Sequence, residues 1–161
     1  MHMAHCDDQA SPGAASADTS DSPRLRLRLA LDMAETERLA AAVDEFADTF
    51  GVPPDVSMQV SLVLEELVTN TIKYGYPDGR AGTVDVELAL LPDALHILVS
   101  DDGDAFDPFS AAEPDLSLAL TERPIGGLGI HLIRKLADAH CYSYRDGRNQ
   151  TRLVKRLAAE P

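Results

Sequence analysis

Three short segments of this chain contain residues whose types and spacing could together bind a nucleotide. In the first, from Glu65 to Tyr76, Glu66 and Asn70 are four residues apart and Lys73 follows three later. Residues at these spacings share one face of a helix. The amide oxygen of Asn70 is a hard ligand suited to Mg²⁺, a carboxylate one turn earlier could accept a hydroxyl proton, and Lys73 could contact a phosphate. A solvated helix face has the same pattern, so this segment alone leaves both interpretations open.

The second segment runs from Val99 to Pro108 and contains Asp101, followed two residues later by Gly103. A carboxylate at the end of a strand could accept a hydrogen bond from the exocyclic amine of adenine, and a glycine lets the backbone approach a ring closely. An ordinary acidic turn would look the same. A calcium-binding loop would place a glutamate at its twelfth position, and counting from Asp101 that position holds Ala112.

The third segment, from Ile125 to Ile133, contains Gly126, Gly127 and Gly129. Glycines at the start of a helix expose backbone N–H groups that bind anions. The dinucleotide-binding pattern fails because its third glycine would fall on Leu132, and the P-loop pattern fails because no Gly-Lys-Ser/Thr follows. A flexible hinge is the remaining alternative.

The hydrophobic pattern predicts the elements that must position these segments. Arg24 to Leu31 alternates leucine with arginine, which is typical of a half-buried strand at a sheet edge. Two helices are expected next, over Glu35–Phe50 and from about Asp55 to Tyr74. The first of them has Leu39, Val43, Phe46 and Phe50 on one face. The remaining expected elements are strands over Thr83–Leu91 and Leu95–Ser100, a long loop over Phe109–Ile125, a helix from Gly126 to about Ala139, and strands over Cys141–Arg145 and Arg152–Leu157, joined by a turn over Asp146–Asn149.

This order of elements predicts the fold class. Neighbouring strands joined by hairpins form an antiparallel or mixed sheet, and helices gathered on one of its faces make an α+β two-layer sandwich. The folded domain is expected over residues 24–161. Residues 1–23 are rich in Ala, Ser, Asp, Gly and Pro without an apolar period, so a disordered tail is expected there. The loop over Phe109–Ile125 is long enough to predict a functional, mobile segment.

The composition limits the class of protein. The net charge of −13 argues against nucleic acid as a direct partner. No run is apolar for the roughly 20 residues that a membrane span needs, and the start lacks the basic and apolar stretches of a signal peptide. The two cysteines, Cys6 and Cys141, do not make a disulfide framework. We therefore expect a cytoplasmic protein with reduced thiols and no membrane partner.

Taken in order, the three segments resemble the motifs of the GHKL ATP-binding superfamily, which includes gyrase, histidine kinases and mismatch-repair ATPases. Glu66-x-x-x-Asn70 is similar to its N box, Asp101-x-Gly103 to its first glycine box and Gly127-x-Gly129 to its second. The short single domain resembles the bacterial anti-sigma-factor serine/threonine kinases, over roughly residues 24 to 157. The details similar to that branch are Thr69-Asn70, Tyr74-Gly75-Tyr76, Phe106-Asp107-Pro108 and Gly126-Gly127-Leu128-Gly129.

The resemblance implies a Bergerat-type fold that binds ATP with Mg²⁺ under a mobile lid. It implies Glu66 as the catalytic base, Asn70 as the magnesium ligand and Asp101 as the adenine reader. The further nucleotide-binding positions that it implies are Lys73, Gly103, Phe106, Gly126, Gly127, Leu128 and Gly129. Members of this branch phosphorylate a Ser or Thr of a small antagonist protein of the STAS type, sequester a sigma factor, and are usually homodimers.

Two positions depart from the family pattern. Ala105 stands where the first glycine box of the superfamily has a second glycine, and the hydroxyl residue usual near the final strand would be Arg152, or Thr151 one place earlier. The second departure leaves open a nucleotide-gated protein-binding module without kinase activity, and a stand-alone ATPase is a third reading. A histidine kinase is disfavoured, because the N box begins with Glu66 where that group usually has asparagine, and because we expect no room for a phosphoacceptor helical hairpin.

Overall fold

The computed structural model describes residues 21–110, 117 and 127–158. Its elements follow the chain as β1 (Arg24–Ala30), α1 (Glu35–Phe50), α2 (Pro54–Tyr74), β2 (Thr83–Leu90), β3 (Ala94–Asp101), α3 (Gly127–Leu136), β4 (Ala139–Arg145) and β5 (Arg148–Arg156). In this part of the chain the strands form one sheet in the order β1-β2-β3-β5-β4. All four pairings are antiparallel. The expected α+β class is confirmed, and the sheet is wholly antiparallel where a mixed one was left open.

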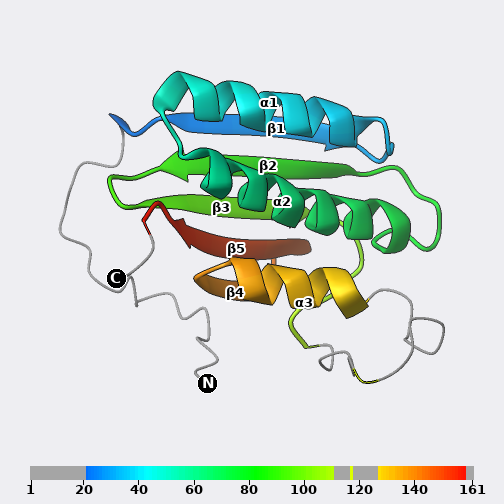
Figure 1. Ribbon diagram of the computed structural model, residues 1–161. Helices are drawn as coiled ribbons and strands as arrows, with labels where there is room; N and C mark the ends of the chain where they lie inside the picture. Colours follow the sequence, from blue (N-terminus) through cyan, green and yellow to red (C-terminus); the bar gives the residue numbers. More distant parts are fainter. Residues whose placement is uncertain (1–20, 111–116, 118–126, 159–161) are drawn as a thin grey trace.

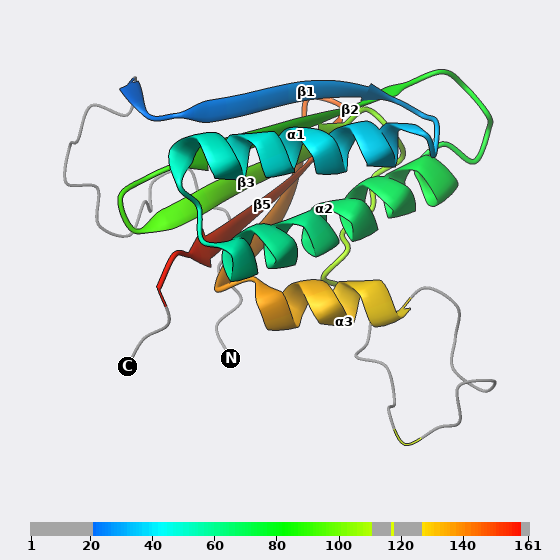
Figure 2. The ribbon, with the colours of Figure 1, turned by 45° about the horizontal axis from the view of Figure 1, so that its top comes forward.

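The three helices lie on one face of the sheet (Figures 1 and 2). α1 packs against β1, and α2 lies over β3 and β5 with α3 beside it. The apolar positions of the helices and the inward positions of the strands make one buried core, which includes Leu29, Leu39, Val43, Leu64, Val68, Val86, Leu88, Ile97, Ile133 and Leu153. No helix of the described residues lies on the opposite face of the sheet, so this part of the molecule has two layers.

The local sequence explains where the first elements begin and end. In β1 the leucines are buried or half-buried and the arginines exposed, as the alternation predicts. α1 ends at Gly51, whose φ of 71° is the left-handed conformation that glycine adopts without strain. α2 begins at Pro54, where proline lacks only an N–H that would have no helical partner. Phe50 was expected on the buried face of α1, but this prediction is wrong, because its side chain at the end of the helix is 45% exposed.

The C-terminal boundaries differ from the predicted ones. α3 ends at Leu136 rather than near Ala139, because the N–H of Asp138 donates to the carbonyl of Val154 (2.9 Å) and so joins the sheet. The turn between β4 and β5 has two residues instead of four. Asp146 and Gly147 have φ values of 53° and 72°, as in the two-residue turns that match the twist of a hairpin. β5 therefore begins at Arg148, four residues earlier than predicted.

Two further expectations are affected by the structure. Cys141 on β4 is disulfide-bonded, so the expectation of reduced thiols is wrong for this residue. Most of the predicted mobile loop over Phe109–Ile125 lies outside the described residues, as does the predicted tail except for its last three residues. Among the helices that the structure describes, none has the length and apolar character to cross a membrane.

Candidate functional site

A cavity of about 180 Å³ lies between α2 and the helix-covered face of the sheet. Asn70 lines it from α2, Asp101 from the end of β3 and Phe106 from the following loop, so the structure brings three of the predicted site residues together. The other lining residues are Leu67, Thr71, Tyr74, Gly75, Val99, Asp104, Ala105, Pro108, Asn149 and Thr151. Apolar side chains and one buried carboxylate meet here, which is the usual composition of a small-molecule site.

Asp101 is 7% exposed and its two carboxylate oxygens have different surroundings. Oδ1 accepts hydrogen bonds from the N–H of Gly103 (2.9 Å) and from the side-chain amide of Asn149 (2.9 Å). Oδ2 accepts none from the described part of the chain. A buried acceptor beside a cavity favours a ligand that carries a hydrogen-bond donor.

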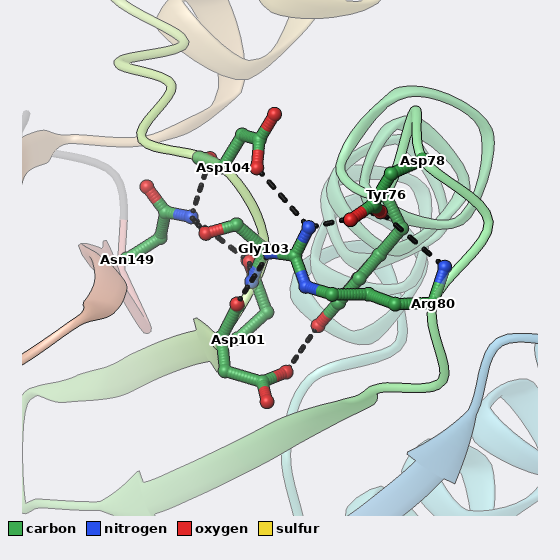
Figure 3. Close-up of polar contacts among 8 residues, drawn as sticks. Tyr76, Asp78, Arg80, Asp101, Gly103, Asp104 and Asn149 are labelled. Carbon is green, nitrogen blue, oxygen red and sulfur yellow. Dashed lines mark hydrogen bonds and ion pairs between the residues drawn. The ribbon is translucent and has the colours of Figure 1, made fainter.

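Asn149 holds the loop that follows Asp101, and this role was missed from the sequence (Figure 3). Its Nδ2 donates to Asp101 Oδ1, to the carbonyl of Asp104 (2.9 Å) and more weakly to that of Gly103 (3.4 Å). Its Oδ1 accepts from the N–H of Phe106 (3.0 Å) and the hydroxyl of Tyr142 (2.5 Å). The side chain is 5% exposed. A two-residue Asp-Gly turn would have placed Asn149 inside β5, so the missed signal was the turn length.

Gly103 packs where no side chain would fit. A Cβ atom built there would lie 2.6 Å from the carbonyl oxygen of Gly75 and 2.8 Å from Asp101 Oδ1. The same carbonyl of Gly75 accepts a hydrogen bond from the N–H of Asp104 (2.9 Å). The sequence predicted that Gly103 leaves space for a ring. The structure shows a further reason for a glycine here, because it lets the loop pack against the end of α2.

The other side of this loop is held by residues that follow α2 (Figure 3). The hydroxyl of Tyr76 donates to Asp102 (2.5 Å), and burial together with this bond raises the pKa of Tyr76 well above its usual range. The guanidinium of Arg80 lies 5.1 Å from the Tyr76 ring centroid and donates to Asp104 Oδ1 (3.2 Å) and to the carbonyl of Asp102 (3.1 Å). Three of the four carboxylates of the segment, on Asp101, Asp102 and Asp104, therefore have separate partners.

Glu66 lies against the start of α3. A Cβ atom added to Gly129 would collide with the Glu66 carboxyl group, so the first and third predicted segments meet at this point. Glu66 and Asn70 are both half-buried on α2, as their spacing predicts, whereas the side chain of Lys73 is exposed. Gly127 and Leu128 form the first residues of α3. Gly126 lies outside the described residues.

The register of β5 decides between Thr151 and Arg152. Thr151 is 6% exposed and lines the cavity. Arg152 points to the opposite face, where its guanidinium donates to Gln150 Oε1 (2.7 Å). A hydroxyl is therefore present at the site, one place earlier than the family spacing suggested.

The sequence and the fold can both be compared with those of known proteins. A family described as "Histidine kinase-like ATPase domain" matches residues 29–155, which is most of the chain. The protein belongs to this family. The matched range contains Glu66, Asn70 and Asp101 together with the cavity that the last two line.

Three individual relatives of this chain are named as serine or serine/threonine protein kinases. The serine/threonine-protein kinase BtrW of Bordetella bronchiseptica is 28% identical over 101 residues, which are 63% of this chain and 71% of that one. The serine-protein kinase RsbW of Bacillus subtilis is 29% identical over 97 residues, 57% of this chain and 60% of that one. RsbW of Bacillus velezensis is 31% identical over the same shares.

A solved structure shares the fold. The crystal structure of the RsbU and RsbW domains of a Mycobacterium tuberculosis protein superposes with a TM-score of 0.61 at 17% identity, covering 84% of this chain and 32% of that one. The chain thus matches about a third of that protein and spans about 60% of the length of the RsbW relatives.

Proposed function

We propose that the cavity between α2 and the sheet binds the base of ATP, with Asp101 as the reader of the adenine amine. The observation that carries this proposal is the buried Asp101 carboxylate, of which one oxygen is fully engaged and the other accepts nothing from the described residues. Adenine offers an N–H donor to such an acceptor, and guanine has a carbonyl there. The volume of about 180 Å³ is below the roughly 300–1,000 Å³ of whole small-molecule sites, and so suits part of a nucleotide.

In this proposal the residues between α2 and the start of α3 would hold the phosphates and Mg²⁺. Asn70 would supply an oxygen to Mg²⁺, which prefers a few protein oxygens together with waters and phosphates. Backbone N–H groups of Gly126, Gly127, Leu128 and Gly129 would hold phosphate oxygens at a helix N-terminus. Lys73 would serve as a point charge near them.

We propose that the chain is a protein serine/threonine kinase in which Glu66 is the catalytic base. Bound ATP with Mg²⁺ supplies the phosphoryl group, and catalysis of its transfer rests mainly on position and charge. Glu66 takes the proton of the attacking hydroxyl. Gly129 leaves the space that the Glu66 carboxylate occupies. Relatives named as serine or serine/threonine protein kinases support this assignment.

The proposed partners are an anti-sigma-factor antagonist of the STAS type and a sigma factor, exchanged according to nucleotide and phosphorylation state. The protein would then regulate transcription in the cytoplasm as a homodimer, without direct contact with nucleic acid or membrane. The membership of the family and the resemblance to its anti-sigma-factor branch support these proposals.

A second candidate is a nucleotide-gated binding module that transfers nothing. One observation favours it: among the described residues that line the cavity there is no Lys or Arg, and the side chain of Lys73 is exposed. Phosphate charge would then be balanced by Mg²⁺ and backbone N–H groups alone. Incubation with labelled ATP and a STAS-type antagonist separates the two candidates, because the module would give a stable ATP complex and no phosphorylated product.

Calorimetric titration of ATP with and without Mg²⁺ tests the site itself. We expect magnesium-dependent binding by the wild type and a loss of at least about tenfold in Asn70→Ala, since one ligand of the ion is removed. Transfer is tested with Glu66→Gln, which should bind ATP normally and transfer nothing. Glu65→Gln is the matched control, because Glu65 is the exposed neighbour of Glu66. Transfer by Glu66→Gln at the wild-type rate would refute the role given to Glu66.

A further inference from the structure

Three exposed hydrophobic side chains of α2 stand in one row with two residues of the candidate site. Five residues follow one another at intervals of four: Met58, Leu62, Glu66, Asn70 and Tyr74. We call them the α2 row. Residues at this spacing are neighbours on a helix surface, with Cβ atoms about 5–6 Å apart. Three of the seven large hydrophobic side chains that are exposed in the described part of the chain belong to this row, which are Met58 at 60%, Leu62 at 40% and Tyr74 at 59%.

The α2 row passes from the cavity to a surface outside it. Tyr74 and Asn70 line the cavity. Glu66 follows one turn nearer to the start of the helix, and Leu62 and Met58 come after it. In the proposed function the base of ATP lies in the cavity and Asn70 binds Mg²⁺ beside the phosphates. The phosphoryl group to be transferred then lies near Glu66, on the side of Asn70 away from the cavity.

This order determines the side from which an acceptor hydroxyl reaches Glu66. In phosphoryl transfer the attacking and the leaving oxygens are in line across the phosphoryl group. The leaving group lies on the cavity side, so the attacking hydroxyl comes from the opposite side, where Leu62 lies. Helical side chains are directed toward the N-terminal end of their helix, so Glu66 leans over the turn that holds Leu62. A segment that delivers a hydroxyl to Glu66 therefore passes over Leu62.

α3 adds a third apolar side chain to this surface. The helix runs beside α2 in the opposite direction (Figure 2). Gly129 of α3 lies against the Glu66 carboxyl group. Leu132 comes about one turn later on α3, and so stands beside the turn of α2 that holds Leu62. Its side chain is half-buried. The surface in front of Glu66 thus carries apolar side chains from two helices.

We propose that Leu62 and Met58 dock the protein segment that carries the acceptor hydroxyl and select apolar side chains beside that hydroxyl. This inference rests on the proposed kinase function. Alternate residues of an extended segment point to one side and lie about 6.5 Å apart, close to the rise of about 6 Å between Glu66 and Leu62. A Ser or Thr at Glu66 therefore places the residue two positions away over Leu62 and the residue four positions away over Met58.

A second copy of the chain fits this surface less well. A dimer formed through Leu62 and Met58 would cover the side from which the acceptor hydroxyl reaches Glu66, and the transfer would be blocked. An acceptor segment covers the same surface only while it is bound, which suits a substrate.

The test uses two fluorescent peptides with one central serine. In the first, leucine stands two and four residues from the serine on both sides, so that either chain direction is covered. In the second, glutamine takes these four places. Anisotropy without nucleotide measures binding, which does not depend on phosphoryl transfer. The test variant is Met58→Gln with Leu62→Gln. The control is Met33→Gln, 44% exposed in the turn before α1. Circular dichroism establishes that each variant is folded.

We expect the wild type to bind the leucine peptide at least about tenfold more tightly than the glutamine peptide, because apolar side chains are buried only in the first case. The double variant should bind both peptides alike, and Met33→Gln should keep the preference. Affinity for ATP should be unchanged in the double variant, since neither residue lines the cavity. With ATP and Mg²⁺, the double variant should raise KM for the leucine peptide at least about tenfold and leave kcat within about twofold.

Equal binding of the two peptides by the wild type would overturn the proposal. So would a preference that survives in the double variant or is lost in Met33→Gln. A wild type that sediments as a dimer beside a monomeric double variant would assign the surface to a second copy, and would overturn it as well. Failure of the proposed function gives a different result: a wild type that prefers the leucine peptide but phosphorylates neither peptide supports the docking surface and contradicts the kinase assignment.

Discussion

Asn149 is the residue whose replacement most directly tests how the candidate site is built. Its amide makes one close donor contact to Asp101 Oδ1 and one to the carbonyl of Asp104, each 2.9 Å, and accepts from Phe106 and Tyr142. Asn149→Ala leaves these groups without their partner in a buried place. Water from the adjoining cavity can replace part of the loss, so we expect a decrease of about 2–4 kcal/mol in the free energy of unfolding, from the cost of roughly 1–3 kcal/mol per unsatisfied buried group.

The same substitution should weaken nucleotide binding. A hydrogen bond to a charged group contributes about 1.5–3 kcal/mol, and Asp101 can supply it only while its carboxylate is held toward the cavity. Loss of that orientation predicts a decrease of about tenfold to a hundredfold in affinity for ATP. Calorimetry measures the affinity, and urea denaturation measures the stability.

Asn149→Asp separates positioning from packing, because it keeps the size of the side chain while it replaces the amide donor by a carboxylate. Two carboxylates would then lie at hydrogen-bonding distance, which raises the pKa of the pair so that they share one proton at lower pH. Affinity for ATP should therefore rise, relative to the wild type, as the pH falls from 8 toward 5.5. Tyr142→Phe is the control: it removes one bond to Asn149 and leaves the contact with Asp101, so affinity should stay within about threefold.

The reasoning fails if Asn149→Ala loses stability yet binds ATP as tightly as the wild type. Asn149 would then join the strand to the loop without orienting Asp101. If the affinity of Asn149→Asp for ATP depends on pH in the same way as that of the wild type, the proposed contact with Asp101 is contradicted as well.

Three other perturbations have outcomes that the structure fixes. Gly103→Ala should lower the free energy of unfolding by about 1–3 kcal/mol in urea denaturation, because a Cβ would press on the carbonyl of Gly75. Gly129→Ala should displace the Glu66 carboxylate and reduce phosphoryl transfer at least about tenfold, while thermal stability is kept or gains up to about 1 kcal/mol from helix propensity. Burial, and secondarily Arg134, lower the pKa of His140. The contribution of His140 to stability is therefore present above its pKa in the unfolded chain, about 6.5, and is lost as the pH falls through its lower pKa in the folded protein. Urea denaturation at several pH values measures this loss.

Each of these outcomes has a contrary one. A stable Gly103→Ala would mean that the loop can move away from α2. Phosphoryl transfer by Gly129→Ala at the wild-type rate would contradict the role of Glu66 as the catalytic base. His140→Gln should reduce the loss of stability at acid pH. If the slope of stability against pH stays unchanged in this variant, the loss comes from other groups. His96→Gln, on the exposed side of β3, is the matched control.

The sequence by itself determined the elements and much of the site. Alternating leucines set β1, and the helical period set α1 and α2, because local spacing fixes which side chains share a face. The spacing of Glu66 and Asn70 likewise fixed their common stripe on α2. The Asp101 and glycine segments were recognised from their residue types and order, and their meeting with α2 could be expected only through a family resemblance.

What the tertiary structure decided depends on contacts between residues far apart in the chain. The contact of Asn149 with Asp101 spans 48 positions, and it exists only because a two-residue turn brings β5 back beside β3 in one register. A shift by one residue would have placed Arg152 in the cavity and Thr151 on the opposite face, since side chains alternate along a strand.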